Sequence, residues 1–145
     1  MAGSVIRVIR MQQFDFSATG DNGETIITFP VPINVAAYAE GTLIARMHSG
    51  TIDSGGTITI NALAYAPTEE DPSRIFVLAG GTYPVAKAEF GNSDVPTTTD
   101  MGTLKKVAFS SNFGAVLVMS IKGKQPATAV TNLKGTFSAD LSLKE

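Results

Sequence analysis

The segment LKGTFSADLSLK, Leu133–Lys144, shows most clearly how this chain folds. Its apolar residues are Leu133, Phe137, Ala139, Leu141 and Leu143, and they oppose Lys134, Thr136, Ser138, Asp140, Ser142 and Lys144. Successive side chains of a β-strand leave opposite faces of the pleat. Strict alternation is therefore typical of an antiparallel strand with one face buried and the other in solvent. The segment is predicted to be such a strand.

Three earlier segments show the same period of two. Leu43, Ala45 and Met47 alternate with Ile44, Arg46 and His48; Ile58, Ile60, Ala62 and Ala64 oppose Thr57, Thr59 and Asn61; Phe113, Ala115, Leu117, Met119 and Ile121 share a face. Weaker strand signals cover residues 13–17, 24–29, 33–38, 75–78, 83–90 and 103–109. No segment shows the period of an amphipathic helix over more than a turn.

Turn residues separate these segments. Asn22-Gly23 predicts a hairpin between strands 14–17 and 24–29. The run from Asp53 to Gly56 predicts that strands 42–48 and 57–66 are neighbours, and residues 67–73 and 91–102 are predicted to be loops. Nine or ten short strands with frequent turns indicate an all-β, antiparallel two-sheet sandwich that is jelly-roll-like.

Composition narrows the function classes. The 145 residues suit one domain, and their formal net charge is only −2. The cations come in pairs, Arg7 with Arg10, Lys105 with Lys106 and Lys122 with Lys124, without the cluster that nucleic acid binding requires. No apolar run is long enough to span a membrane, no signal peptide is evident, and the chain has no cysteine. We therefore expect neither a nucleic acid nor a membrane partner, and synthesis in the cytoplasm.

The residues offer little chemistry. His48 is the only histidine, it is expected to end a strand, and no Ser/His/Asp grouping accompanies it in the sequence. The acids Glu69, Glu70 and Asp71 could offer oxygen ligands to Ca²⁺ if Asp53 or Asp100 folded nearby, but they lack the spacing of a calcium loop. We expect no enzyme activity, no cofactor and no metal. The chain has no Trp and three Tyr, which weakens a carbohydrate-binding interpretation without excluding it.

The N-terminal segment carries a hypothesis of its own. Val5 and Ile6 form one apolar pair and Val8 and Ile9 another, separated by Arg7 and Arg10. In a regular strand this spacing puts apolar groups on both faces and points the two arginines opposite ways. A helix is disfavoured because all four apolar residues are β-branched. Residues 1–11 are therefore expected to be an arm or edge strand beside a single domain, 12–145, and to bury a second face against a neighbouring subunit or lattice. An ordinary interior strand is the alternative.

Parts of the chain resemble small structural proteins of tailed phages and prophages. The similar segments are the strand of residues 40–50, which ends in Arg46-Met47-His48-Ser49, the Gly/Thr-rich hairpin after it, the acidic Asp-Pro segment 66–72, the strand that begins Ile75-Phe76 and the closing segment 137–145. The resemblance covers about half the chain and not its first thirty residues. It implies a capsid decoration or cement protein, a homo-oligomer with a trimer favoured, located in the virion and made in the bacterial host cytoplasm.

These observations support one leading hypothesis and several alternatives. The leading hypothesis is a non-enzymatic structural protein that binds a symmetric protein lattice, such as a major capsid protein. A carbohydrate-binding or adhesive module and a minor tail protein are the alternatives. The candidate partner-binding residues are Val5, Ile6, Arg7, Val8, Ile9, Arg10, Arg46 and His48.

Overall fold

The computed structural model describes residues 3–17, 23–35, 38–53, 55–67, 75–77, 85–91, 104–110, 116–126 and 132–144. Within them the regular elements are β1 (Gly3–Asp15), β2 (Glu24–Asn34), β3 (Glu40–Ile52), β4 (Thr57–Pro67), β5 (Ile75–Val77), β6 (Ala86–Gly91), β7 (Leu104–Ser110), β8 (Val116–Lys124) and β9 (Leu133–Lys144). These described residues include no helix long and apolar enough to cross a membrane.

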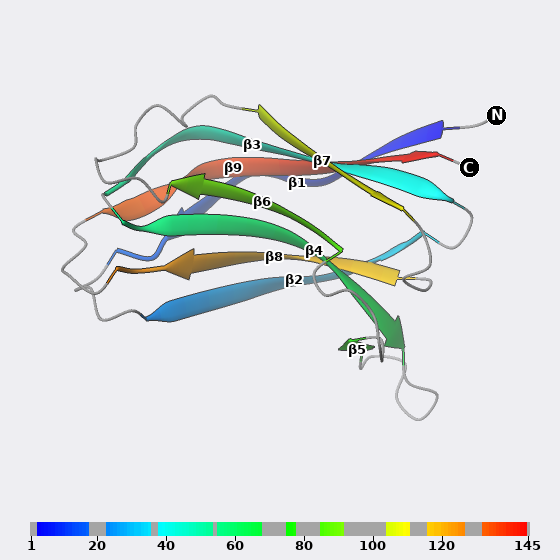
Figure 1. Ribbon diagram of the computed structural model, residues 1–145, viewed down its shortest axis with the longest axis horizontal. Helices are drawn as coiled ribbons and strands as arrows, with labels where there is room; N and C mark the ends of the chain where they lie inside the picture. Colours follow the sequence, from blue (N-terminus) through cyan, green and yellow to red (C-terminus); the bar gives the residue numbers. More distant parts are fainter. Residues whose placement is uncertain are drawn as a thin grey trace.

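The strands form two antiparallel sheets that face each other (Figure 1). The first sheet has the order β1-β9-β3-β7, and the second has the order β2-β8-β4-β5, with β6 paired to β4. The chain alternates between the sheets from β1 to β4 and again from β6 to β9. This order is that of a jelly roll, to which β5 adds one short strand. The predicted fold class is confirmed.

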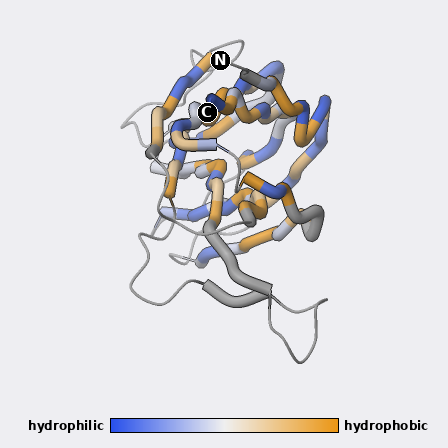
Figure 2. Tube along the Cα trace, turned by 90° about the vertical axis from the view of Figure 1, so that its right-hand side faces the viewer, coloured by the Kyte–Doolittle hydropathy of each residue, from blue (hydrophilic) through white to orange (hydrophobic). Residues whose placement is uncertain are grey.

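The core lies between the sheets and follows the alternation read from the sequence. The buried residues on the predicted inner positions are Leu43, Ala45, Met47, Ile58, Ile60, Ala62, Leu117, Met119, Ile121, Leu133, Phe137, Ala139, Leu141 and Leu143. Hydropathy accordingly alternates along these strands (Figure 2). Phe113, Ala115 and the side chain of Ala64 lie outside what the structure describes.

Four phenylalanine side chains pack against one another in this core. Phe137 on β9 is fully buried, and its ring lies 6.0 Å from that of Phe14 on β1 and 6.1 Å from that of Phe29 on β2. Phe16 stacks on Phe14 at 5.8 Å. Phe137 therefore joins three strands from both sheets through ring contacts.

Two predicted connections are wrong. Asn22-Gly23 does not close a hairpin, because β1 pairs with β9 in the first sheet and β2 pairs with β8 in the second. The run from Asp53 to Gly56 likewise joins β3 to β4 across the sandwich, and these strands are not hydrogen-bonded neighbours. Local turn residues indicate where a strand ends, but in a jelly roll the next strand often starts in the opposite sheet.

Two weak strand predictions need correction at their ends. Residues 33–38 do not form a separate strand, because β2 continues to Asn34 and the N–H of Tyr38 then donates to the carbonyl oxygen of Val35 at 3.1 Å. The predicted strand 13–17 is the end of β1, which stops at Asp15. There the N–H of Ser17 donates to Asp15 Oδ1 at 2.9 Å, and this bonding to Ser17 lowers the pKa of the Asp15 carboxyl.

The N-terminal segment is part of the first sheet. β1 is the edge strand of that sheet and pairs with β9 from Gly3 to Asp15. Ile9 is buried, while Ile6 and Val8 are partly buried and pack on the core. Only Val5 among its four apolar residues is largely exposed, at 65%. Of these four residues, the expectation of an exposed second apolar face therefore holds for Val5 alone.

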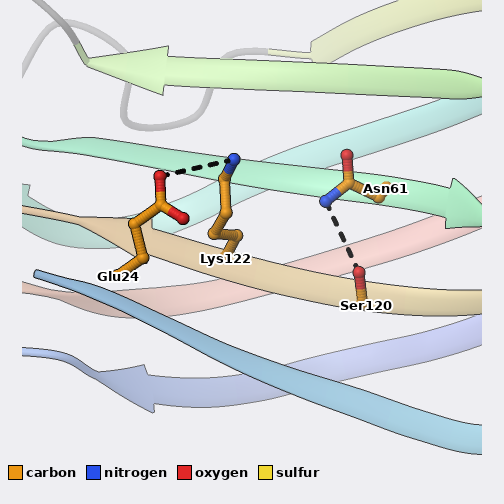
Figure 3. A network of polar contacts seen from close by, with 4 residues as sticks. All are labelled: Glu24, Asn61, Ser120 and Lys122. Atoms are coloured by element: carbon orange, nitrogen blue, oxygen red, sulfur yellow. Dashed lines mark hydrogen bonds and ion pairs between the residues drawn. The ribbon is translucent and has the colours of Figure 1, made fainter. Parts of the chain in front are cut away.

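The outer face of the second sheet carries polar residues, some of which are buried. Asn61 on β4 and Ser120 on β8 are both buried, and Asn61 Nδ2 donates to Ser120 Oγ at 3.4 Å (Figure 3). Towards one end of the same face, Lys122 Nζ lies 4.0 Å from Glu24 Oε1. The charges at that end of the face are thus partly paired.

We predict that Phe137→Ala lowers the free energy of unfolding by about 3–5 kcal/mol, because it removes a buried ring from the centre of the core. Urea denaturation monitored by circular dichroism measures this change. Thr136→Ala, on the outer side of the same strand, is the control and should change stability by about 0.5 kcal/mol or less. Equal effects of the two substitutions would show that the core is placed wrongly.

Candidate functional site

The outer face of the first sheet is built from residues that the strand register brings into rows. Arg7 on β1 pairs with Asp140 on β9, which pairs with Ile44 on β3, which in turn pairs with Lys106 on β7. In the next row towards the other end, Ser138 on β9 pairs with Arg46 on β3. These outward residues come from four strands that are far apart in the sequence.

The rows enclose a shallow hollow of about 410 Å³, here named the cationic hollow. It is lined by Arg7, Arg10, Ile44, Arg46, His48, Leu104, Lys106, Ser138 and Asp140. The polar residues among them are the outward members of the alternating pattern, while the inward members of the same strands form the core. One sheet therefore provides both the core and the hollow.

Two irregularities of β1 turn both arginines to this face. The pairing with β9 shifts between Arg7 and Ile9 and again between Ile9 and Gln12, so β1 carries extra residues at both places. Each bulge reverses the alternation, so residues three apart return to the same side of the strand. Arg7 and Arg10 therefore both line the hollow, and the expectation that they point opposite ways is wrong.

A third irregularity places His48. The pairing of β3 with β9 shifts between Met47 and Ser49, and His48 is the extra residue. The strand then continues to Ile52, so the expectation that His48 ends a strand is also wrong. The shift explains how both Met47 and Ile52 remain buried although five positions separate them. His48 itself is half-buried and lines the hollow.

The hydroxyl of Ser138 connects the irregular parts of β1 and β3. It accepts a hydrogen bond from the N–H of Met11 at 2.9 Å and lies 2.7 Å from His48 Nε2. Met11 has a φ of 48°, a conformation that is uncommon for a residue other than glycine. The central strand β9 thus holds the bulges of both its neighbours through one side chain.

The contact between Ser138 and His48 was missed in the sequence, where the two residues are far apart. A catalytic triad needs the histidine between the serine and an acid, with the acid bonded to the second ring nitrogen. Here the register puts Ser138 between His48 and Asp140, and no hydrogen bond joins Asp140 to His48 among the described residues. The arrangement is that of a structural hydrogen bond.

The electrostatics of the hollow are one-sided. Arg7, Arg10, Arg46 and Lys106 face a single acid, Asp140, so the hollow has an excess of three positive charges in a chain with a net charge of −2. Asp140 has no ion pair within 4.0 Å in the described part of the chain. The positive charge is therefore open to a partner.

Apolar side chains lie beside these charges. Leu104 in the hollow is 39% exposed, and Met11, opposite Ser138, is 60% exposed. Val5 lies one row away, where it pairs with Ser142. Arginine and methionine are both enriched at protein interfaces.

The structure brings together four of the eight candidate partner-binding residues. Arg7, Arg10, Arg46 and His48 line the hollow, while Val5 is exposed nearby and Ile6, Val8 and Ile9 face the core. Lys106 and Asp140 were missed, because their neighbours are set by strand order. Lys105, the sequence neighbour of Lys106, lies over the ring of Phe90 at 4.8 Å instead. Alternation along β7 separates the two lysines.

No metal site is evident in the described residues, which include no group of three or more His, Cys, Asp or Glu side chains that could hold an ion. Asp53 Oδ2 accepts a hydrogen bond from the N–H of Asn132 at 2.8 Å, so it has a structural role. Glu69, Glu70, Asp71 and Asp100 lie outside the described residues.

Comparisons with known proteins find only a low overall structural similarity. No protein-family model matches the chain, and no curated protein does. The structure of the Gx strain of infectious bursal disease virus is 15% identical, with a TM-score of 0.48, and 98% of this chain covers 31% of that one. The VP2 subviral particle of the same virus is 16% identical, with coverages of 98% and 32% and a TM-score of 0.45.

A third structure, of T=1 particles derived from infectious bursal virus, is 14% identical, with coverages of 98% and 31% and a TM-score of 0.40. This chain thus spans about a third of the length of each of these virus-particle chains. At these identities and scores, neither the site nor the function follows from them.

We predict that Ser138→Ala lowers the free energy of unfolding by about 1–2 kcal/mol, because it removes the acceptor of Met11 and the partner of His48. Thermal or urea denaturation measures the loss. Ser142→Ala, two positions along the same face, is the control and should have almost no effect. A Ser138→Ala variant as stable as the parent would contradict the bridging role of this hydroxyl.

Proposed function

We propose that this protein is a non-enzymatic virion structural protein, a capsid decoration or cement protein that binds a symmetric protein lattice through the outer face of its first sheet. The observation that carries the proposal is the open, cationic and partly apolar hollow on that face. The opposite side of the same sheet is occupied by the core. The outer face is therefore free to contact another protein without disturbing the fold.

The architecture is consistent with this role. Jelly rolls serve repeatedly as capsid domains because their two sheets give a stiff body that presents side chains at fixed spacing. Here the hollow is formed by side chains of strands, which hold position better than loops do. The resemblance of segments 40–50 and 137–145 to phage structural proteins supports the same proposal.

Assembly on a lattice favours a symmetric oligomer, and a homotrimer is the form we propose. The first strand contributes to the attachment in this proposal, with Val5 and Met11 beside the arginines of the hollow. Several weak contacts per subunit then act together, so the oligomer stays attached although each hollow is small.

A carbohydrate-binding module is the second candidate, because lectins also use the jelly roll. The hollow supports it less, since no aromatic side chain of the described residues lines it and sugar rings are commonly bound by stacking on aromatic rings. A glycan array distinguishes the two candidates directly.

Under the proposed function, virus particles purified on a density gradient from the source cells contain this chain in a fixed ratio to the shell subunit. Mass spectrometry of the particle band measures that ratio. Removal of the chain at high salt should lower the temperature at which the shells open, and adding it back should restore that temperature, as a cement protein requires.

Two outcomes contradict the proposal. One is that the chain stays in the unassembled fraction while intact particles are recovered without it. The other is specific and saturable binding to a glycan with no binding to particles, which would establish the second candidate. A monomer in light scattering would overturn the trimer alone.

A further inference from the structure

We propose that the cationic hollow is a carboxylate-binding site, which docks an acidic segment of the partner protein. The inference rests on the proposed function for the identity of the partner as a protein, but its test is independent of any particle. It names the chemistry that the outer face recognises.

The first argument for this site is the position of its cationic side chains. Arg7 and Arg10 reach the hollow from β1, Arg46 from β3 and Lys106 from β7, so positive groups surround it from both sides of β9. All four side chains are exposed. A guanidinium group presents paired N–H donors that match the two oxygens of a carboxylate. Three arginines around one hollow therefore suit a segment with several acidic side chains.

The second argument is the irregular backbone around the hollow. The pairing register of the first sheet shifts between Arg7 and Ile9, between Ile9 and Gln12, and between Met47 and Ser49. All three shifts border the hollow. Bulges are common beside binding sites, where they redirect side chains. Without the shifts in β1, Arg7 and Arg10 would lie on opposite faces. The irregular backbone is thus what gathers the cations.

Asp140 and the apolar residues select a peptide over nucleic acid. Asp140 lies between Arg7 and Ile44 in the central row of the hollow, where it repels a continuous chain of phosphates. Leu104 and Ile44 offer apolar surface that a peptide side chain can cover. An acidic segment can place its carboxylates on the arginines and leave Asp140 beside a neutral residue.

The test is an NMR titration of the whole protein with a short blocked peptide of alternating Asp and Glu. We expect amide shifts confined to residues 5–11, 44–48, 104–107 and 138–141, with affinity falling as salt rises. Arg46→Glu should weaken binding about tenfold or more, and Arg46→Gln by a smaller factor. Lys124→Glu makes the same charge change on the exposed part of β8 and should leave the affinity within about twofold.

Several results would overturn the inference. These are no shifts at the hollow with millimolar peptide, equal binding of an Asn/Gln peptide of the same length, equal effects of Arg46→Glu and Lys124→Glu, or tighter binding of a thymidine oligonucleotide. Thermal melts of the variants confirm that each is folded.

The two proposals fail separately. Peptide binding without attachment to particles supports the carboxylate site and contradicts the proposed function. If the Arg46→Glu variant still attaches to particles, the carboxylate site is contradicted and the proposed function is not.

Discussion

The need to keep apolar side chains facing inwards is the constraint on which the structure depends. A strand alternates faces with a period of two, so an apolar residue that falls out of step must be exposed or the backbone must gain a residue. Ile9 on β1 is out of step with both Ile6 and Phe14, yet all three contact the core. The bulges of β1 reconcile them, at the cost of regular pairing along that strand.

The same adjustment shapes the outer face. Because Ile6 and Ile9 both face inwards, Arg7 and Arg10, one position further on, are both exposed and line one hollow. The bulge at His48 serves Met47 and Ile52 in the same way and brings the ring of His48 to Ser138. Packing of the core and assembly of the hollow therefore both result from the same bulged backbone. The hydroxyl of Ser138 stabilises this backbone by its contacts with β1 and β3.

Much of this fold is predictable from the sequence, and the limits have physical reasons. Alternation identifies the inner faces of β3, β4, β8 and β9 because each of those stretches keeps step over several residues. Strand neighbours are not predictable from turns such as Asn22-Gly23, since sheet crossing depends on long-range packing. The candidate site was half found: Arg7, Arg10, Arg46 and His48 were named, but Ser138 and Lys106 join them only through strand order. The repeat Val-Ile-Arg-Val-Ile-Arg at residues 5–10 was the available signal for a bulge, because its period is three.

The central claim is that bulges in β1 set the register against β9, and cross-strand nuclear Overhauser contacts between backbone protons test it most directly. The account predicts contacts that place Ile9 opposite Ala139 and Gln12 opposite Phe137. An uninterrupted ladder continuing from Arg7 opposite Asp140 would instead place Ile9 opposite Ser138 and Gln12 opposite Gly135. Observation of that second pattern would contradict the account, because Arg7 and Arg10 would then lie on opposite faces and the hollow would not form.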